Sequence, residues 1–392
     1  MPSDTISVNL THSRLDLNQV SYYTPLLVYK CAKIKLNTAS PKHKILYLNV
    51  NDYEKAIGAL EKEGNNGDDE FNAEKEYLKQ AIQSFFAEDD KGLRAVTLAI
   101  YKDTAEAKGI KELFKRSRNS FIVFINTYAS NNDGGDGLTI YKDDYVNFKD
   151  PAHFFVFATK ESEVKELFKN GSNSKSKIIV VHSKGTQQLH LRFVSKYLHE
   201  ASMFHAVNPY GLTFSGINPI TNSEEITKLR QANINFYSHL NESGLDGFPA
   251  FKEGICLDSS PIDEIFTYDY IKYEFIAELI RIWNLNNRQN SKLSALQLSG
   301  QRDTAYSAAI ACKLKEFVDA GIIVSYSKLK IQISASASLK LFLSLSITYN
   351  YSMKGVVLNI TTQDIQSYQN SLRRLNNGAG LQLNENIFLN QR

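Results

Sequence analysis

The sequence has few cysteines, little net charge and no long apolar run. Its three cysteines, Cys31, Cys256 and Cys312, are far apart, which argues against a disulfide framework or a zinc site and favours a reducing compartment. The net charge of +3 is mixed along the chain, so nothing indicates binding to nucleic acid or to an anionic membrane. No run reaches the roughly 18 apolar residues of a membrane helix. The first residues do not resemble a signal peptide, so we expect a cytosolic product without membrane insertion.

The motifs of common enzymes are also missing. There is no Gly-x-x-x-x-Gly-Lys-Ser/Thr phosphate loop, no Gly-x-Gly-x-x-Gly after a strand and no Gly-x-Ser-x-Gly elbow. The histidines His190, His199 and His205 would lie on different faces of a helix, which disfavours a metal site. We therefore expect no catalytic residue, cofactor or metal ion, and the chain is predicted not to be an enzyme.

Three aspartates and one cysteine are expected to have structural roles. Asp258, Asp263 and Asp269 are close in sequence, but Asp263 is expected in the first turn of a helix and Asp258 at the end of a strand. Structural roles are therefore favoured over a catalytic cluster. Cys312 falls on the apolar stripe of a predicted helix and is expected in a core.

Residues 93–206 alternate apolar strands with amphipathic helices. Strands are predicted at 93–101, 121–128, 154–159 and 177–183, after earlier strands at 22–30 and 43–50. Continuous apolar strands separated by helices are typical of a mostly parallel sheet that is covered on both faces. The fold class is therefore predicted to be α/β.

Helices become longer after residue 220. Thr221 to Glu224 have the spacing of a capping box, and a strand at 233–240 is expected to return at 253–258. Ser260 and Pro261 predict the start of a helix that runs to about Trp283. A further helix, 304–320, is expected to end at Gly321.

The segment 329–353 alternates apolar and polar residues. Its odd positions are apolar, and only Phe342 interrupts the polar even positions. A period of two predicts strands with one solvated face, and the length requires a bend or hairpin near 335–338. After Gly355 the apolar positions become even, at Val356, Leu358 and Ile360, which indicates one more short strand.

Several segments together resemble contractile tail sheath proteins of bacteriophages and related injection machines. They are the Leu-x-x-Ala-x-Ile-Asn pattern at 229–235, Asp-Tyr-Ile at 269–271, Gly-Ile-Ile at 321–323 and Tyr-x-x-Ala-Ile-Gly at 53–58. The resemblance implies an outer α/β domain with a mostly parallel sheet and an inner α+β domain built from both chain ends, with extended terminal arms. The implied boundaries are an N-terminal arm strand at 1–25, which belongs to the inner domain, an outer domain at 26–258, an inner domain at 259–365 and a polar tail or arm at 366–392.

In such proteins, terminal strands pair into the sheets of neighbouring subunits. The resemblance therefore implies inter-subunit strands in two short alternating segments, whose apolar members are Ile6, Val8, Leu10, Val356, Val357, Leu358 and Ile360. It also implies a helical stack of rings in the virion tail, assembled in the host cytoplasm. The implied partners are further copies of the chain, an inner tail tube protein, and baseplate and terminator proteins.

Three alternatives remain open at this point. Both terminal strands could pair within their own subunit. The chain could be an α/β nucleotide-binding enzyme that uses the strand ends of its sheet. It could also be a sheath-related adaptor or terminator that does not polymerise.

Overall fold

The computed structural model describes a large part of the chain. The residues described are 22–31, 35–36, 43–49, 52–61, 68–88, 95–101, 119–126, 153–159, 177–183, 187–204, 207–239, 248–288, 305–328, 330–333 and 341–349. The chain divides into two compact units, Met1–Ser352 and Met353–Arg392, and all of these residues belong to the first. The predicted domain boundaries remain predictions.

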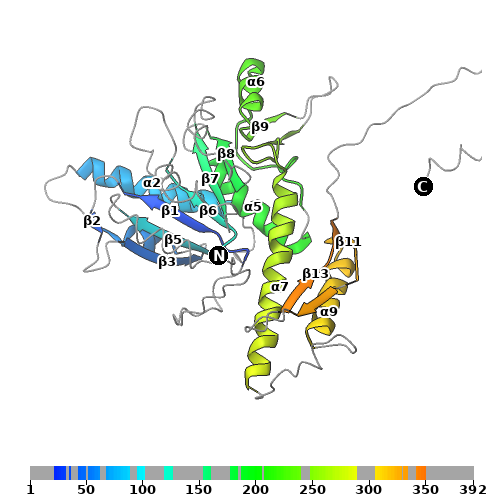
Figure 1. The fold of residues 1–392 in the computed structure, drawn as a ribbon. Coiled ribbons are helices and arrows are strands. Elements are labelled where there is room, and N and C mark those ends of the chain that lie inside the picture. Colours follow the sequence, from blue (N-terminus) through cyan, green and yellow to red (C-terminus); the bar gives the residue numbers. More distant parts are fainter. Residues whose placement is uncertain are drawn as a thin grey trace, which may run out of the picture. The chain divides into compact units, whose positions relative to one another are not determined.

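A six-stranded sheet forms the centre of the fold (Figure 1). Its spatial order is β3-β5-β1-β6-β7-β8, and all neighbours are parallel except the edge pair β3 and β5. The predicted mostly parallel α/β sheet is therefore confirmed. The bounds are β1 Leu26–Lys30, β3 His43–Asn49, β5 Ala95–Tyr101, β6 Phe121–Phe124, β7 Phe154–Thr159 and β8 Ile178–His182.

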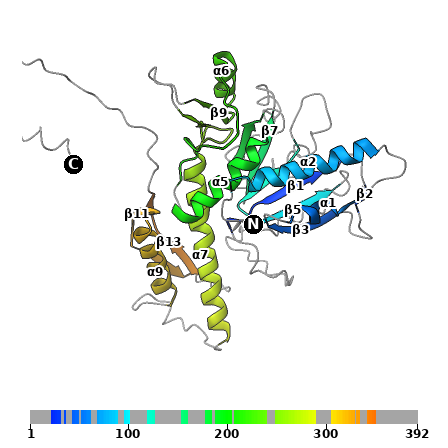
Figure 2. The same ribbon diagram turned by 180° about the vertical axis from the view of Figure 1, so that it is seen from behind.

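Helices cover one face of this sheet. α2 (Asp68–Phe86) and α5 (Leu189–Phe204) lie side by side on that face (Figures 1 and 2). Their apolar stripes bury alternate strand residues such as Leu27, Val123 and Val156. The other face packs against α6 (Ser223–Gln231) and the segment that follows it, with Leu229 and Ile234 in contact with the strands. We call this assembly the α/β core.

Small elements complete the α/β core. The pair β2 (Lys35–Leu36) and β4 (Leu60–Glu61) is antiparallel, and the short helix α1 (Tyr53–Ile57) packs on α2. Beyond β8, the backbone of Asn235 extends the sheet through hydrogen bonds with Val180 and His182. Asn235 leads into the antiparallel pair β9 (Phe236–His239) and β10 (Pro249–Lys252).

The predicted position of β10 was wrong. The returning strand was expected at 253–258, but it lies at Pro249–Lys252, immediately before that stretch. Glu253 and Gly254 both have positive φ, 75° and 63°, so the backbone turns where the strand was expected to begin. A glycine fits Gly254 because a Cβ there would lie 3.1 Å from the Tyr210 backbone nitrogen.

Two helix starts differ from the prediction by one residue. α6 is capped by Asn222 and not by Thr221, since the Asn222 side chain accepts hydrogen bonds from the Glu224 and Glu225 amides. α7 (Ile262–Arg288) begins after Pro261, which forms a bridge with Ile255, and it continues beyond the predicted end at Trp283.

A second core lies around the middle of α7. It contains Ile271, Ile310, Leu314, Phe317, Ile322 and Ile323. α9 (Ala305–Asp319) ends before Gly321, whose φ of 70° suits a glycine after a helix. Cys312 is exposed, contrary to prediction, because it lies two residues from buried Ile310 and so on the opposite side of α9.

The alternating segment forms two small antiparallel sheets. β12 (Lys330–Ile333) pairs with β13 (Leu341–Ser344), which confirms the predicted hairpin across 334–340. β11 (Ile323–Tyr326) pairs with β14 (Ile347–Tyr349), with one shift in register. We call α9, β11, β14 and the part of α7 from Ile271 onward the C-terminal layer.

Candidate assembly surface

The predicted inter-subunit strands lie outside the described residues. This applies to Ile6, Val8 and Leu10 and equally to the segment that holds Val356, Val357, Leu358 and Ile360. The structure does describe the small C-terminal sheets, and Tyr22 and Tyr23, which follow the N-terminal segment and are called its root below.

The sheet of β11 and β14 packs on the second core and also carries exposed apolar side chains. Ile323 is buried there, whereas Val324 and Tyr326 are 59% and 41% exposed. The register of β11 shifts at Val324, and Tyr326 lies opposite Ile347, which packs partly against the second core. Within the described residues, β11 and β14 pair only with each other, and so do β12 and β13. Within this part of the chain, each of these strands thus has one edge without a partner strand.

The second half of α7 is also incompletely covered. From Lys272 to Arg281 no residue is fully buried, although this stretch contains Phe275, Ile276 and Leu279. Phe275 and Leu279 pack partly against the second core, and Ile276 is 45% exposed. An apolar helix surface of this kind is typical of a contact with another molecule or segment.

Aromatic rings surround the root of the N-terminal segment. The Tyr22 ring centroid lies 5.3 Å from that of Phe266, 5.7 Å from Tyr270 and 5.0 Å from Tyr273. Burial and then the charge of Asp269 raise the pKa of Tyr22 well above its ordinary value, so its hydroxyl stays neutral. Tyr22, with which the described part of the chain begins, is therefore held beside α7.

Lys177 and Asp269 form a buried ion pair near these rings. Lys177 Nζ is 2.8 Å from Asp269 Oδ2 and 3.0 Å from Asp269 Oδ1, and both side chains are almost inaccessible. Lys177 immediately precedes β8, whereas Asp269 is on α7. The pair therefore connects the sheet of the α/β core with the helix that continues into the C-terminal layer.

The carboxyl ends of the parallel strands are the place where open α/β sheets bind ligands. The strand order reverses between β1 and β6, and there the Asn126 side chain accepts from the Lys30 amide at 2.9 Å and donates to its carbonyl at 3.2 Å. This amide therefore spans the two strand ends. The described residues contain no group of three or more metal-ligating side chains.

Two polar side chains at the start of α5 are buried near the same edge. Gln188 and His190 make no side-chain hydrogen bond within the described part of the chain. Burial lowers the pKa of His190 to about 3, although the Phe124 and Ile125 carbonyls that face the ring oppose this shift. His190 is therefore neutral at physiological pH.

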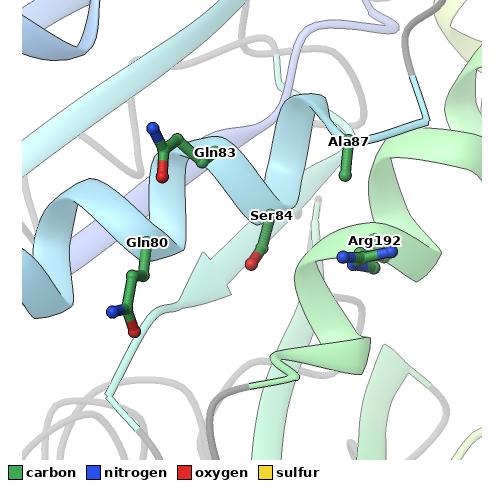
Figure 3. Close-up of a pocket in the computed structure, with 5 residues that line it drawn as sticks. All are labelled: Gln80, Gln83, Ser84, Ala87 and Arg192. Atoms are coloured by element: carbon green, nitrogen blue, oxygen red, sulfur yellow. The ribbon is translucent and has the colours of Figure 1, made fainter. Parts of the chain in front are cut away.

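A hollow of about 380 Å³ lies between α2 and α5 (Figure 3). Gln80, Gln83 and Ser84 line it from α2, Ala87 lines it just after α2 ends, and Arg192 lines it from α5. The Arg192 guanidinium already donates to the Ser215 carbonyl at 2.5 Å and pairs with Glu88 at 3.3 Å. Its charge is thus compensated within the fold, and the hollow contains no acid–base pair.

Comparison with known families decides where the chain belongs. The N-terminal domain of the DUF787 family matches residues 1–259, and the C-terminal domain of the same family matches residues 262–373. The chain belongs to the DUF787 family. No curated protein matches this DUF787 chain. None of its described helices combines the length and the apolar character that a membrane crossing requires.

One solved structure has a related arrangement. The DUF787 chain is similar to the crystal structure of the sheath tail protein Lin1278 from Listeria innocua, with 9% sequence identity and a TM-score of 0.48. The match covers 82% of this chain and 94% of the Listeria chain.

The motifs quoted from the DUF787 sequence lie at structural junctions. Leu229, Ala232 and Ile234 pack on the sheet, and Asn235 extends it beyond β8. The side chain of Asn235 also holds the Ile255 backbone. Its amide oxygen accepts from Ile255 N at 3.0 Å, and its amide nitrogen donates to Ile255 O at 2.8 Å. Sequence reasoning missed Lys177, because a lysine before an apolar strand is indistinguishable from an ordinary solvated flank.

Proposed function

We propose that this chain is the structural subunit of a contractile tail sheath. It polymerises helically around an inner tube in a virion tail, after assembly in the host cytoplasm, and contracts by rigid-body rearrangement to drive injection. It acts as a structural protein without catalysis. Its partners are copies of itself, the tube protein, and the baseplate and terminator proteins.

The observation that carries this proposal is the incomplete C-terminal sheet region. Two-stranded sheets are only marginally stable on their own, and a third strand or a packed helix stabilises them. The described strands β11 to β14 form two such pairs, and Val324 and Tyr326 leave apolar surface beside an open edge. A strand from a neighbour can supply backbone hydrogen bonds and apolar side chains at this place.

The sequence contains two segments that suit this role. Residues 5–11 place Ile6, Val8 and Leu10 on one face, and residues 356–360 form the second alternating segment. The resemblance of residues 225–326 to sheath proteins supports the same function. A strand donated from one copy to the next is a heterologous contact, and such contacts propagate into a helical filament when they do not close into a ring.

Electron microscopy of the purified full-length protein tests the proposal. A variant without residues 1–12 should remain folded, as judged by circular dichroism, and should not form tubes. The apolar face of residues 5–11 is tested by the triple substitution Ile6→Ser, Val8→Ser and Leu10→Ser, which should also abolish tubes.

A matched control changes the opposite face of the same segment. Ser7→Thr, Asn9→Ser and Thr11→Ser retain the apolar face and should leave tube formation intact. Normal tubes from the truncated protein or from the triple serine variant would contradict the proposed strand donation. A full-length protein that stays monomeric under all conditions would favour the non-polymerising adaptor.

A further inference from the structure

α7 passes through both apolar cores of the described chain. Ile262 and Phe266 are buried in the α/β core, and Ile271 is buried in the C-terminal layer. Ile271 lies five positions after Phe266, a little over one helical turn. Because the helix is continuous between them, its orientation on the α/β core determines where the C-terminal layer lies.

The ion pair between Lys177 and Asp269 restricts the rotation of α7 about its own axis. The two Asp269 oxygens lie 2.8 and 3.0 Å from Lys177 Nζ, and the side chains are 9% and 5% exposed. Buried charges are costly when unpaired, and their hydrogen bonds demand a definite geometry, unlike apolar contacts. A rotation of α7 about its axis would withdraw Asp269 from Lys177 and leave both charges buried without each other.

Tyr270, the next residue, contacts three separate parts of the chain. Its ring centroid lies 5.7 Å from those of Tyr22 and Tyr23 and 6.2 Å from that of Phe317 on α9. A side-chain hydrogen bond also links the Tyr23 and Tyr270 hydroxyls. Tyr270 therefore touches both the root of the N-terminal segment and the helix that packs on α7.

We propose that Asp269, Tyr270 and Ile271 are positioning residues that form a rigid joint. Asp269 holds α7 to the α/β core, Ile271 holds it to the C-terminal layer, and Tyr270 holds the root of residues 1–21 between them. The α/β core, the C-terminal layer and this root consequently move as one body. This property belongs to a single subunit and does not depend on the proposed assembly.

The joint is tested by a distance between two spin labels within one molecule. Cys312 on α9 is exposed, whereas Cys31 and Cys256 are buried, so α9 carries a native labelling site. A second site is introduced by Gln83→Cys at an exposed position of α2. Pulsed electron resonance is recorded on the full chain diluted with unlabelled protein, so that only distances within one molecule are measured.

The unmutated joint should give a single narrow distance distribution. The double variant Lys177→Met and Asp269→Leu keeps the apolar volume and leaves no buried charge unpaired, so it should remain folded. Its distribution should be at least about twofold broader, because apolar packing alone tolerates more than one orientation. Tyr270→Leu should also broaden the distribution, to a smaller extent.

Arg230→Met is the matched control. It breaks the Arg230–Glu253 ion pair, whose atoms are 2.9 Å apart and which lies wholly within the α/β core. This control should leave the distance distribution unchanged. A broad distribution in the protein with the intact joint overturns the proposal, whether or not the variants fold. A folded double variant with the original narrow distribution also overturns it.

Discussion

The α/β core and the C-terminal layer use the same kinds of residue in different ways. Five strands of the large sheet are buried on both faces, and their aromatic residues stack on one another, as Phe121 does on Phe154 at 4.9 Å. The C-terminal layer has strands in pairs and exposes Val324, Tyr326 and Ile276. The five strands of the first region bury their apolar residues within the described chain, and its exposed apolar residues lie outside them, at Ile45 and Tyr47 on β3 and at Phe248. In the second region the exposed apolar residues lie on β11 and on α7.

Removal of a ring from the α/β core should have the largest effect. Phe154 is fully buried between the sheet and the helices, so Phe154→Ala leaves a cavity and should lower the free energy of unfolding by about 3–5 kcal/mol. Urea unfolding monitored by circular dichroism measures the loss. A loss below about 1 kcal/mol would mean that the two-face burial does not dominate stability.

The same type of substitution in the C-terminal layer should act locally. Phe317 packs against Tyr270 and Phe275, and Phe317→Ala should destabilise the layer by about 3 kcal/mol. Hydrogen exchange should accelerate in α9, β11 and β14, while the strands of the large sheet keep their protection. Equal acceleration in the large sheet would show that the two regions unfold as one unit.

His190 makes the stability of the α/β core depend on pH. Its pKa is about 3 in the folded chain and about 6.5 in an unfolded one, so only the unfolded chain takes up the proton between these values. Stability should therefore fall as pH drops below 6.5, by about 2 kcal/mol at pH 5. Chemical unfolding at pH 7 and pH 5 measures this loss, and His190→Met should remove it. His199 is half-buried on the same helix, and His199→Gln is the control that should keep the pH dependence. If His190→Met kept the full pH dependence, His190 would not be its source.

The cap of α6 should contribute a smaller amount. Asn222→Ala removes the acceptor of two backbone amides and should cost about 1 kcal/mol. Thr221→Ala should have little effect, although the sequence pattern favoured Thr221 as the cap. Thermal unfolding of both variants distinguishes the two residues, and a larger loss from Thr221→Ala would refute the observed capping.

The exposed pair on β11 should affect folding least. Val324→Ser and Tyr326→Ser change solvated side chains, so the free energy of unfolding should stay within about 0.5 kcal/mol. Under the proposed function, the same two substitutions should reduce tube formation in electron micrographs. Unaltered tubes would show that Val324 and Tyr326 take no part in the assembly.

Patterns of local sequence predicted the elements better than their connections. The parallel strands and the hairpin of β12 and β13 follow from apolar periodicity, which depends only on neighbouring residues. The antiparallel placement of β3 at the sheet edge was not predicted, because periodicity does not specify the direction of a neighbouring strand. Positive φ at Glu253, which displaced β10, is likewise invisible in a pattern of polar and apolar residues.

The candidate site was less accessible from sequence than the fold. Lys177 and Asp269 are separated by 92 positions and meet only because β8 and α7 pack together. Cys312 seemed to belong to the core because α9 contains many apolar residues, and only its angular position shows that it is exposed. Such features depend on tertiary contacts, whereas the pairing of β12 with β13 agrees with the bend or hairpin predicted from the alternating segment.

Because α7 is continuous, the number of residues between buried Phe266 and buried Ile271 determines how the C-terminal layer is rotated and displaced relative to the α/β core. Insertion of one residue between Phe266 and Ile271 would rotate everything beyond it by about 100° and advance it by about 1.5 Å. Insertion of seven residues would return the C-terminal layer to within about 20° of its original rotation about the helix axis, but would displace it along that axis by about 10 Å. Homologous chains that vary freely in their loops should therefore keep the length of this helical interval unchanged.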